Sequence, residues 1–143
     1  MVIPKLTDDY LPPGIYDCDI EEVNATFGTN NQRLHLLNNL IEYIKDARNQ
    51  GISGEVIING SFVTSKEDPD DIDIILVLDD YNITGPLNMD ECNLLSCEYT
   101  STEYDLDVLV AFKNDNTETE TIEIFSRVRE DPNITKGLLR VKI

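Results

Sequence analysis

Three stretches rich in branched and aromatic residues place the strongest constraint on the fold of this chain. They lie at residues 55–59, 71–78 and 103–112. Residues of these types are typical of β-strands, and each stretch is long enough for one. We therefore expect three core strands. The final segment, GLLRVKI at 137–143, is expected to add an edge strand.

A long helix is predicted before these strands. Apolar residues recur at helical spacing over 30–50, and Gly51 follows, where a left-handed helix terminator is favoured. The members of this stripe are Leu34, Leu37, Leu40, Ile41, Ile44 and Ala47. Because an amphipathic helix needs an apolar surface to pack against, we expect it to cover one face of the sheet. Shorter helices are predicted after Asp19, around 89–96 and over 119–130.

Length and charge limit what the chain can be. Its 143 residues, 41% of them hydrophobic, suit a single folded domain over 1–143. The net charge of -17, from 28 acids against 11 bases, disfavours membranes and general binding of duplex DNA, and suits cations or a basic partner protein. No apolar run approaches the ~20 residues that span a bilayer. We expect a cytoplasmic protein with reduced thiols.

Two acids stand where the second predicted strand begins. Side chains alternate faces along a strand, so Asp71 and Asp73 share one face, roughly 6.5 to 7 Å apart. In so acidic a chain about five or six acidic pairs at this spacing arise by chance, so the pattern alone is weak. This pair, however, leads into IILVL, and unpaired carboxylates beside a buried strand are costly. A divalent cation that bridges both carboxylates would remove that cost.

The third predicted strand carries a similar pair, Asp105 and Asp107. If this strand neighbours the second, three carboxylates converge. Asp107 is favoured as the third acid because it begins the uninterrupted stretch VLVAF, as Asp73 begins IILVL, and Asp105 is the alternative. Oxygen ligands with open positions for water and phosphate suit Mg²⁺. The sequence therefore predicts a magnesium site.

Gly60 and Ser61 follow the first predicted strand, ten residues before the acid pair. A residue without a Cβ lets phosphate approach backbone amides, and a hydroxyl can donate to a phosphate oxygen. A strand-ending Gly-Ser is more often an ordinary turn, and it gains weight here from the acids that follow. The few basic candidates for phosphate contact, each with a solvated surface role as the alternative, are Lys66, Arg33 and Lys136.

Together these residues resemble the nucleotidyltransferase signature of the DNA polymerase beta superfamily. The shared pattern is an apolar strand, Gly60-Ser61, a nine-residue gap, D-I-D at 71–73 and a later strand acid. The segments LPPGIY, FGTNNQR, GSFVTSKEDPDDIDIIL and KGLL also resemble small nucleotidyltransferase-like proteins of bacteria and their viruses, over most of the chain. The resemblance implies an α/β (α+β) fold, in which helices flank a mixed β-sheet.

The resemblance also implies roles for the candidate residues. Gly60 and Ser61 would hold a nucleoside triphosphate, and Lys66 is a further candidate for nucleotide binding. The carboxylates that would bind metal and act in catalysis are Asp71, Asp73 and Asp107, the last also as potential general base.

Two functions are compatible with these features. The first is Mg²⁺-dependent transfer of a nucleoside monophosphate from a nucleoside triphosphate to a protein or RNA acceptor. The second is a catalytically weak or inactive nucleotidyltransferase-fold protein that binds a partner, as an antitoxin-like or acidic module. Likeness at the level of the fold does not choose between them.

Overall fold

A computed structural model describes residues 3–79, 88–113, 116–127 and 133–143. In chain order, its strands are β1 (Ile15–Asp17), β2 (Gly54–Asn59), β3 (Ile72–Leu78), β4 (Leu106–Phe112) and β5 (Leu138–Lys142). Its helices are α1 (Ile20–Phe27), α2 (Asn31–Asn49), the short 3-10 helix η1 (Gly60–Val63), α3 (Met89–Leu94), α4 (Cys97–Tyr104) and α5 (Asn116–Phe125).

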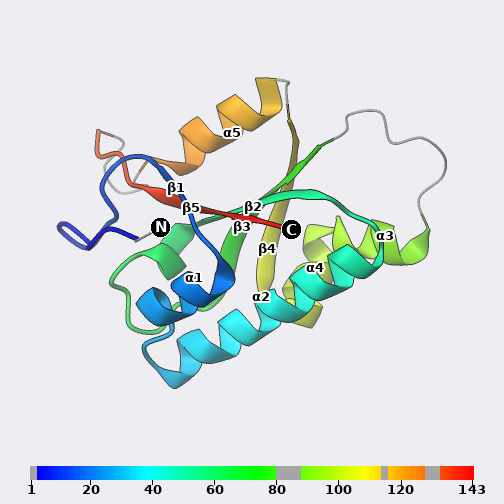
Figure 1. The fold of residues 1–143 in the computed structure, drawn as a ribbon, viewed down its shortest axis with the longest axis horizontal. Coiled ribbons are helices and arrows are strands. Elements are labelled where there is room, and N and C mark those ends of the chain that lie inside the picture. Colours follow the sequence, from blue (N-terminus) through cyan, green and yellow to red (C-terminus); the bar gives the residue numbers. More distant parts are fainter. Residues whose placement is uncertain (1–2, 80–87, 114–115, 128–132) are drawn as a thin grey trace.

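The strands form one five-stranded sheet in the order β1-β5-β2-β3-β4 (Figure 1). β3 runs parallel to β4 and β1 parallel to β5, whereas β2 is antiparallel to both of its neighbours, β3 and β5. The sheet is therefore mixed, as expected for the α/β class.

Helices pack on both faces of the sheet, which explains why its central strands are apolar on both sides. On one face, even-numbered residues such as Val56, Ile58 and Ile74 join the side chains of α1 and α2. On the other face, Ile57, Ile75 and Val77 lie with partly buried residues of α5. In Figure 1, α5 lies across the sheet from α1 and α2. Burial of a strand on both faces favours a continuous run such as IILVL over strict alternation.

The predicted edge strand at the C-terminus is instead an interior strand, because β1 covers its outer side. No local sequence pattern predicted β1, which has three residues directly after LPPG. Backbone bonds join these distant segments: the amide of Gly137 donates to Leu11 O at 2.9 Å, and that of Leu138 to Gly14 O at 2.9 Å. The motifs LPPGIY and KGLL thus meet at the same edge of the sheet.

The long helix is confirmed as α2, but its buried face differs from the predicted one. Asn30 caps it by accepting from Arg33 N, and Gly51 takes the left-handed conformation with φ of 76°. Leu34 and Ile41 were expected inside, yet they are 38% and 40% exposed. The residues that face the sheet and the neighbouring helices are Arg33, Leu36, Leu37, Leu40, Tyr43, Ile44 and Ala47. This stripe keeps a helical period but includes a cation, which hydrophobicity alone does not select.

Other predicted boundaries shift. The third strand begins at Leu106 and not at 103, because residues 97–104 form α4, which ends at Asp105 with φ of 53°. The helix predicted around 89–96 is the shorter α3, and Asp19 caps α1 with a reciprocal bond to Glu22 as expected. The last predicted helix corresponds to α5; its expected C-terminal part, 128–130, lies outside the described residues. No helix in the described ranges is long and apolar enough to cross a membrane.

Candidate functional site

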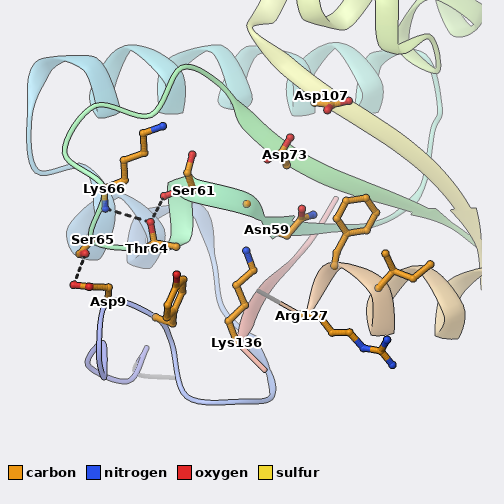
Figure 2. Close-up of a pocket in the computed structure, with 14 residues that line it drawn as sticks. Asp9, Asn59, Ser61, Thr64, Ser65, Lys66, Asp73, Asp107, Arg127 and Lys136 are labelled. Atoms are coloured by element: carbon orange, nitrogen blue, oxygen red, sulfur yellow. Dashed lines mark hydrogen bonds between the residues drawn. The ribbon is translucent and has the colours of Figure 1, made fainter. Parts of the chain in front are cut away.

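A cavity of about 790 Å³ opens where β2 ends and where the parallel strands β3 and β4 begin. Its wall includes Gly60 and Ser61 after β2, and Asp73 and Asp107 from β3 and β4. Figure 2 shows the two carboxylates on one side of the cavity and Lys136 on the other. The cavity thus joins the Gly-Ser turn to acids from two separate strands.

Asp73 and Asp107 are direct cross-strand neighbours. They are register partners in the parallel pair of β3 and β4, so their side chains lie on the same face of the sheet. Burial, followed by the charges of Asp71 and Asp107, raises the pKa of Asp73 to about 6. Asp73 therefore holds its proton to a higher pH than an isolated carboxyl group does.

Asp71 belongs to the same electrostatic group, although it does not line the cavity. It precedes β3, and burial, then the charges of Asp107 and Asp70, raises its pKa. The charges of these acids act on one another, but the predicted convergence of Asp71, Asp73 and Asp107 on one cation stays a prediction, because no three acids among the described residues are arranged as a metal-binding group. Such mutual repulsion destabilises three carboxylates that are all ionised.

Asp105, the alternative third acid, has a different position. It adopts the left-handed conformation that ends α4, and its Oδ2 atom lies 3.6 Å from Nε2 of His35 on α2. Its backbone oxygen accepts from the amide of Ile72. Asp105 thus joins α4, α2 and β3, while Asp107 faces Asp73.

Gly60 lies directly against the acid pair. Its φ is +73°, and a Cβ atom added to it would lie 1.9 Å from Oδ2 of Asp73. Any side chain at position 60 would therefore displace that carboxylate. The neighbouring Ser61 lies in η1, and its backbone oxygen accepts from the hydroxyl of Thr64 at 2.6 Å. The turn brings backbone close to the acids, as the Gly-Ser spacing predicted.

Arg33 has a different role from the one considered for it. It is 3% exposed, does not line the cavity, and donates to the backbone oxygens of Phe62 at 2.7 Å and Thr64 at 2.8 Å, and also to those of Phe27 and Lys66. Its guanidinium carbon lies 5.0 Å from the ring centre of Phe62. Because its guanidinium already donates to these backbone oxygens, Arg33 is not available to a phosphate. Because it is buried, the alternative prediction, a solvated surface role, is also wrong. Arg33 thus binds the backbone of the loop after β2 from the buried side, away from the cavity.

Two further polar side chains on the FGTNNQR segment hold the same loop. The side-chain amide of Asn30 donates to Glu67 O at 2.6 Å, and that of Gln32 to Pro69 O at 2.9 Å. With Arg33, they fix the start of α2 to the segment that connects η1 with β3. The loop that borders the cavity is thus tied at several backbone positions.

Lys66 and Lys136 both face the acids. The charge of Lys66 lowers the pKa of Asp71, and that of Lys136 lowers the pKa of Asp73, in each case against larger raising effects. Both lysines line the cavity, and Figure 2 shows them on opposite sides of it. Two of the three basic candidates are therefore positioned to contact an anion in the cavity.

Several cavity residues were not predicted from the sequence. Those most distant from the motifs are Asp9, Tyr10, Ile124, Phe125 and Arg127. The N-terminal segment reaches the cavity because Tyr10 forms a β-bridge with Thr64. No local pattern marks such residues, because only the packing of α5 and the N-terminal segment brings them there.

Two unpredicted groups lie close to the acids. The thiol of Cys97 donates to Oδ1 of Asp107 at 2.9 Å. Asn59 lies opposite Asp73 in the β2–β3 pair and is 1% exposed; among the described residues its Oδ1 atom has no hydrogen-bond partner. The position of Asn59, directly before Gly60-Ser61, could have indicated from the sequence that it lies at the site.

Comparison with known proteins bears on the whole chain. A model for a family of unknown function, DUF6932, matches residues 4–142. The chain belongs to this family. Searches of the curated proteins and of the solved structures each found no match.

The donor chemistry of this DUF6932 site suits a hard divalent cation. Asp73 and Asp107 are cross-strand neighbours, the charge of Asp71 raises the pKa of Asp73, and Gly60 leaves the space that the Asp73 carboxylate fills. Within the described ranges, however, no three Asp, Glu, His or Cys side chains are already arranged as a metal-binding group. Because burial and neighbouring negative charges raise the pKa of Asp73, metal binding at mildly acidic pH would have to displace the proton of this carboxyl group.

Proposed function

We propose that this protein is a metal-dependent nucleotidyltransferase, which transfers a nucleoside monophosphate from a nucleoside triphosphate to a protein or RNA acceptor. The observation that carries the proposal is the pairing of Asp73 with Asp107 beside Gly60, with Asp71 in the same electrostatic group. The resemblance of these motifs to the DNA polymerase beta superfamily supports the same assignment.

In this proposal, Asp71, Asp73 and Asp107 hold Mg²⁺. Bound there, the cation would neutralise charge on the phosphates and on the departing pyrophosphate. The acceptor hydroxyl oxygen forms a bond to the α-phosphorus, and the bond from that phosphorus to the bridging oxygen breaks, so pyrophosphate leaves. Asp107, at the cavity wall, accepts the hydroxyl proton as general base.

The remaining residues of the cavity position the triphosphate. Gly60 and Ser61 offer backbone and a hydroxyl beside the acids, and Lys66 supplies positive charge from the loop. Lys136 contributes from the opposite side of the cavity. Fixed donors of this kind stabilise charge without reorganisation during the reaction.

The direct test is transfer of label from nucleotides that carry it on the α-phosphate. Purified protein, each of the four nucleoside triphosphates and Mg²⁺ are incubated with mixed cellular protein or RNA as acceptor. We expect label in the acceptor, and none with the double variant Asp71→Asn, Asp73→Asn. The proposal fails if no nucleotide gives label and none raises the melting temperature of the protein with Mg²⁺.

A second candidate is a nucleotidyltransferase-like protein that has lost catalysis and binds a partner, such as a basic protein. The observation in its favour is that the acids of the described chain are not arranged to hold a metal as they stand. The net charge of -17 suits a basic partner. In that case the double Asp→Asn variant retains partner binding in full; loss of binding in this variant counts against the second candidate.

A further inference from the structure

A second cavity, of about 640 Å³, lies away from the carboxylate site and shares no lining residue with it. It is lined by the C-terminal half of α2, the entry to α1 and the strand β5. A volume in this range is typical of sites for small molecules. The proposed nucleotidyl transfer makes no use of it.

The floor of this groove is aliphatic. Ile20, Ile41, Ile44 and Val141 line it, and none of its lining residues is aromatic. Ile41 is 40% exposed although it lies on a helix whose other face is fully packed. Flat rings gain most from aromatic walls, whereas a flexible alkyl chain gains contact with an aliphatic floor. The lining therefore favours an aliphatic ligand.

Positive charge is concentrated around this floor. Four of the 11 basic residues of the chain line the groove: Lys45, Arg48, Arg140 and Lys142. In the described part of the protein, the side-chain ammonium groups of Lys45 and Lys142 have no hydrogen bond or ion pair, although the chain has 28 acids. These two lysines are therefore available to an external anion.

The acids of the groove are already engaged. Asp17 accepts two hydrogen bonds from Arg140, at 2.6 and 3.0 Å. Asp19 accepts from Glu22 N at 2.8 Å, as the cap of α1. Neither carboxylate forms a hydrogen bond or ion pair with the two lysines, although the charge of Lys142 helps to lower the pKa of Asp17, so the groove combines an apolar floor with positive charge.

We propose that this groove binds a small amphipathic anion, with a saturated alkyl chain along the isoleucine floor and a carboxylate at Lys45 and Lys142. Burial of the chain provides affinity, and the lysines select the anionic head group. The inference does not depend on the proposed transferase activity, because the two cavities have no residue in common.

Titration with decanoate below its micelle-forming concentration tests the proposal. Calorimetry with the intact protein should give a Kd below about 1 mM. Ile41→Gln should weaken binding about tenfold, while Leu34→Gln, which changes a residue of similar exposure on the same helix outside the groove, should leave it unchanged. Equal effects of the two substitutions, or no binding of decanoate at millimolar concentration, would overturn the proposal.

The head group is tested by charge. Lys45→Gln with Lys142→Gln should weaken decanoate binding about tenfold, whereas Lys5→Gln, at an exposed lysine outside the groove, should not change it. Decanol should bind more weakly than decanoate, and decyltrimethylammonium should not displace it. Binding of either compound at the groove as tightly as decanoate contradicts the anion preference and overturns the proposal.

Discussion

A Cβ atom placed on Gly60 would lie 1.9 Å from Oδ2 of Asp73, so the backbone of one residue occupies the space beside the carboxylate of the other. Gly60 directly follows β2, which is antiparallel to β3, and Asn59, the last residue of β2, is the register partner of Asp73. Asp73 is in turn the register partner of Asp107 on the next strand. A single close approach therefore connects the Gly-Ser turn to the acids of β3 and β4.

Gly60→Ala should destabilise the protein more than Gly51→Ala. Both glycines have a left-handed φ, +73° and +76°, but a Cβ on Gly51 meets nothing within 4 Å. The backbone cost alone is about 1 kcal/mol, and the clash with Asp73 should raise the total at position 60 to about 3 kcal/mol. Denaturant unfolding measures both values. Equal losses for the two variants would show that the close approach in the structure is wrong.

Arg33→Lys should destabilise the protein by about 3 kcal/mol, because a buried ammonium cannot donate to all the backbone oxygens that the guanidinium satisfies. Hydrogen exchange over 62–69 should accelerate in the same variant. Arg48→Lys, at an exposed position on the same helix, is the matched control and should change stability by less than about 0.5 kcal/mol. Unchanged exchange in the loop would contradict the role of Arg33.

Without metal, the ionisation of Asp73 should lower the free energy of unfolding of the protein as the pH rises. Its pKa is raised to about 6 in the folded protein from 3.8, so the stability that its protonated form contributes is complete below 3.8 and is lost as the pH passes 6. Relative to the parent protein, Asp73→Asn should therefore raise the melting temperature at pH 8, by about 5 °C, and have little effect at pH 3.5. Thermal unfolding in the presence of a chelator measures this difference.

Asp17 provides a control of opposite sign for that experiment. Its hydrogen bonds with Arg140 lower its pKa, so its contribution is present above 3.8 and is lost as the pH falls through the lowered value. Asp17→Asn should lower the melting temperature at pH 8. If both variants shift the melting temperature in the same direction at pH 8, the opposite pKa shifts are wrong.

Asp107 and Asp105 should differ in binding of Mg²⁺ with nucleotide. At 100 times Kd, the ligands should stabilise the parent protein by about 2.7 kcal/mol. Asp107→Asn should abolish this gain, because Asp107 faces Asp73. Asp105→Asn should keep it, because Asp105 ends α4 in a left-handed conformation that Asn also tolerates. Thermal unfolding with and without the ligands measures the gains, and retention by Asp107→Asn would exclude this residue as the third acid.

The sequence by itself determined the local features of this protein. Apolar runs of branched residues predicted β2, β3 and β4, and the 3.6-residue period with Asn30 and Gly51 at its ends predicted α2. Such features depend on neighbours within a few residues, and local propensity, capping and alternation are sufficient to indicate them. The alternation of acids with apolar residues likewise indicated Asp71, Asp73 and Asp107 as candidates.

Only the tertiary structure decided which of these groups meet. Strand order and register placed Asp107 opposite Asp73 and left Asp105 at His35, although both acids alternate with apolar residues in the same way. Packing also buried Arg33, a candidate for phosphate contact, where its guanidinium donates to backbone oxygens of the loop. The reason is physical: a side chain's environment at these positions depends on segments tens of residues away, whose pairing is selected by burial of the whole sheet rather than by local sequence.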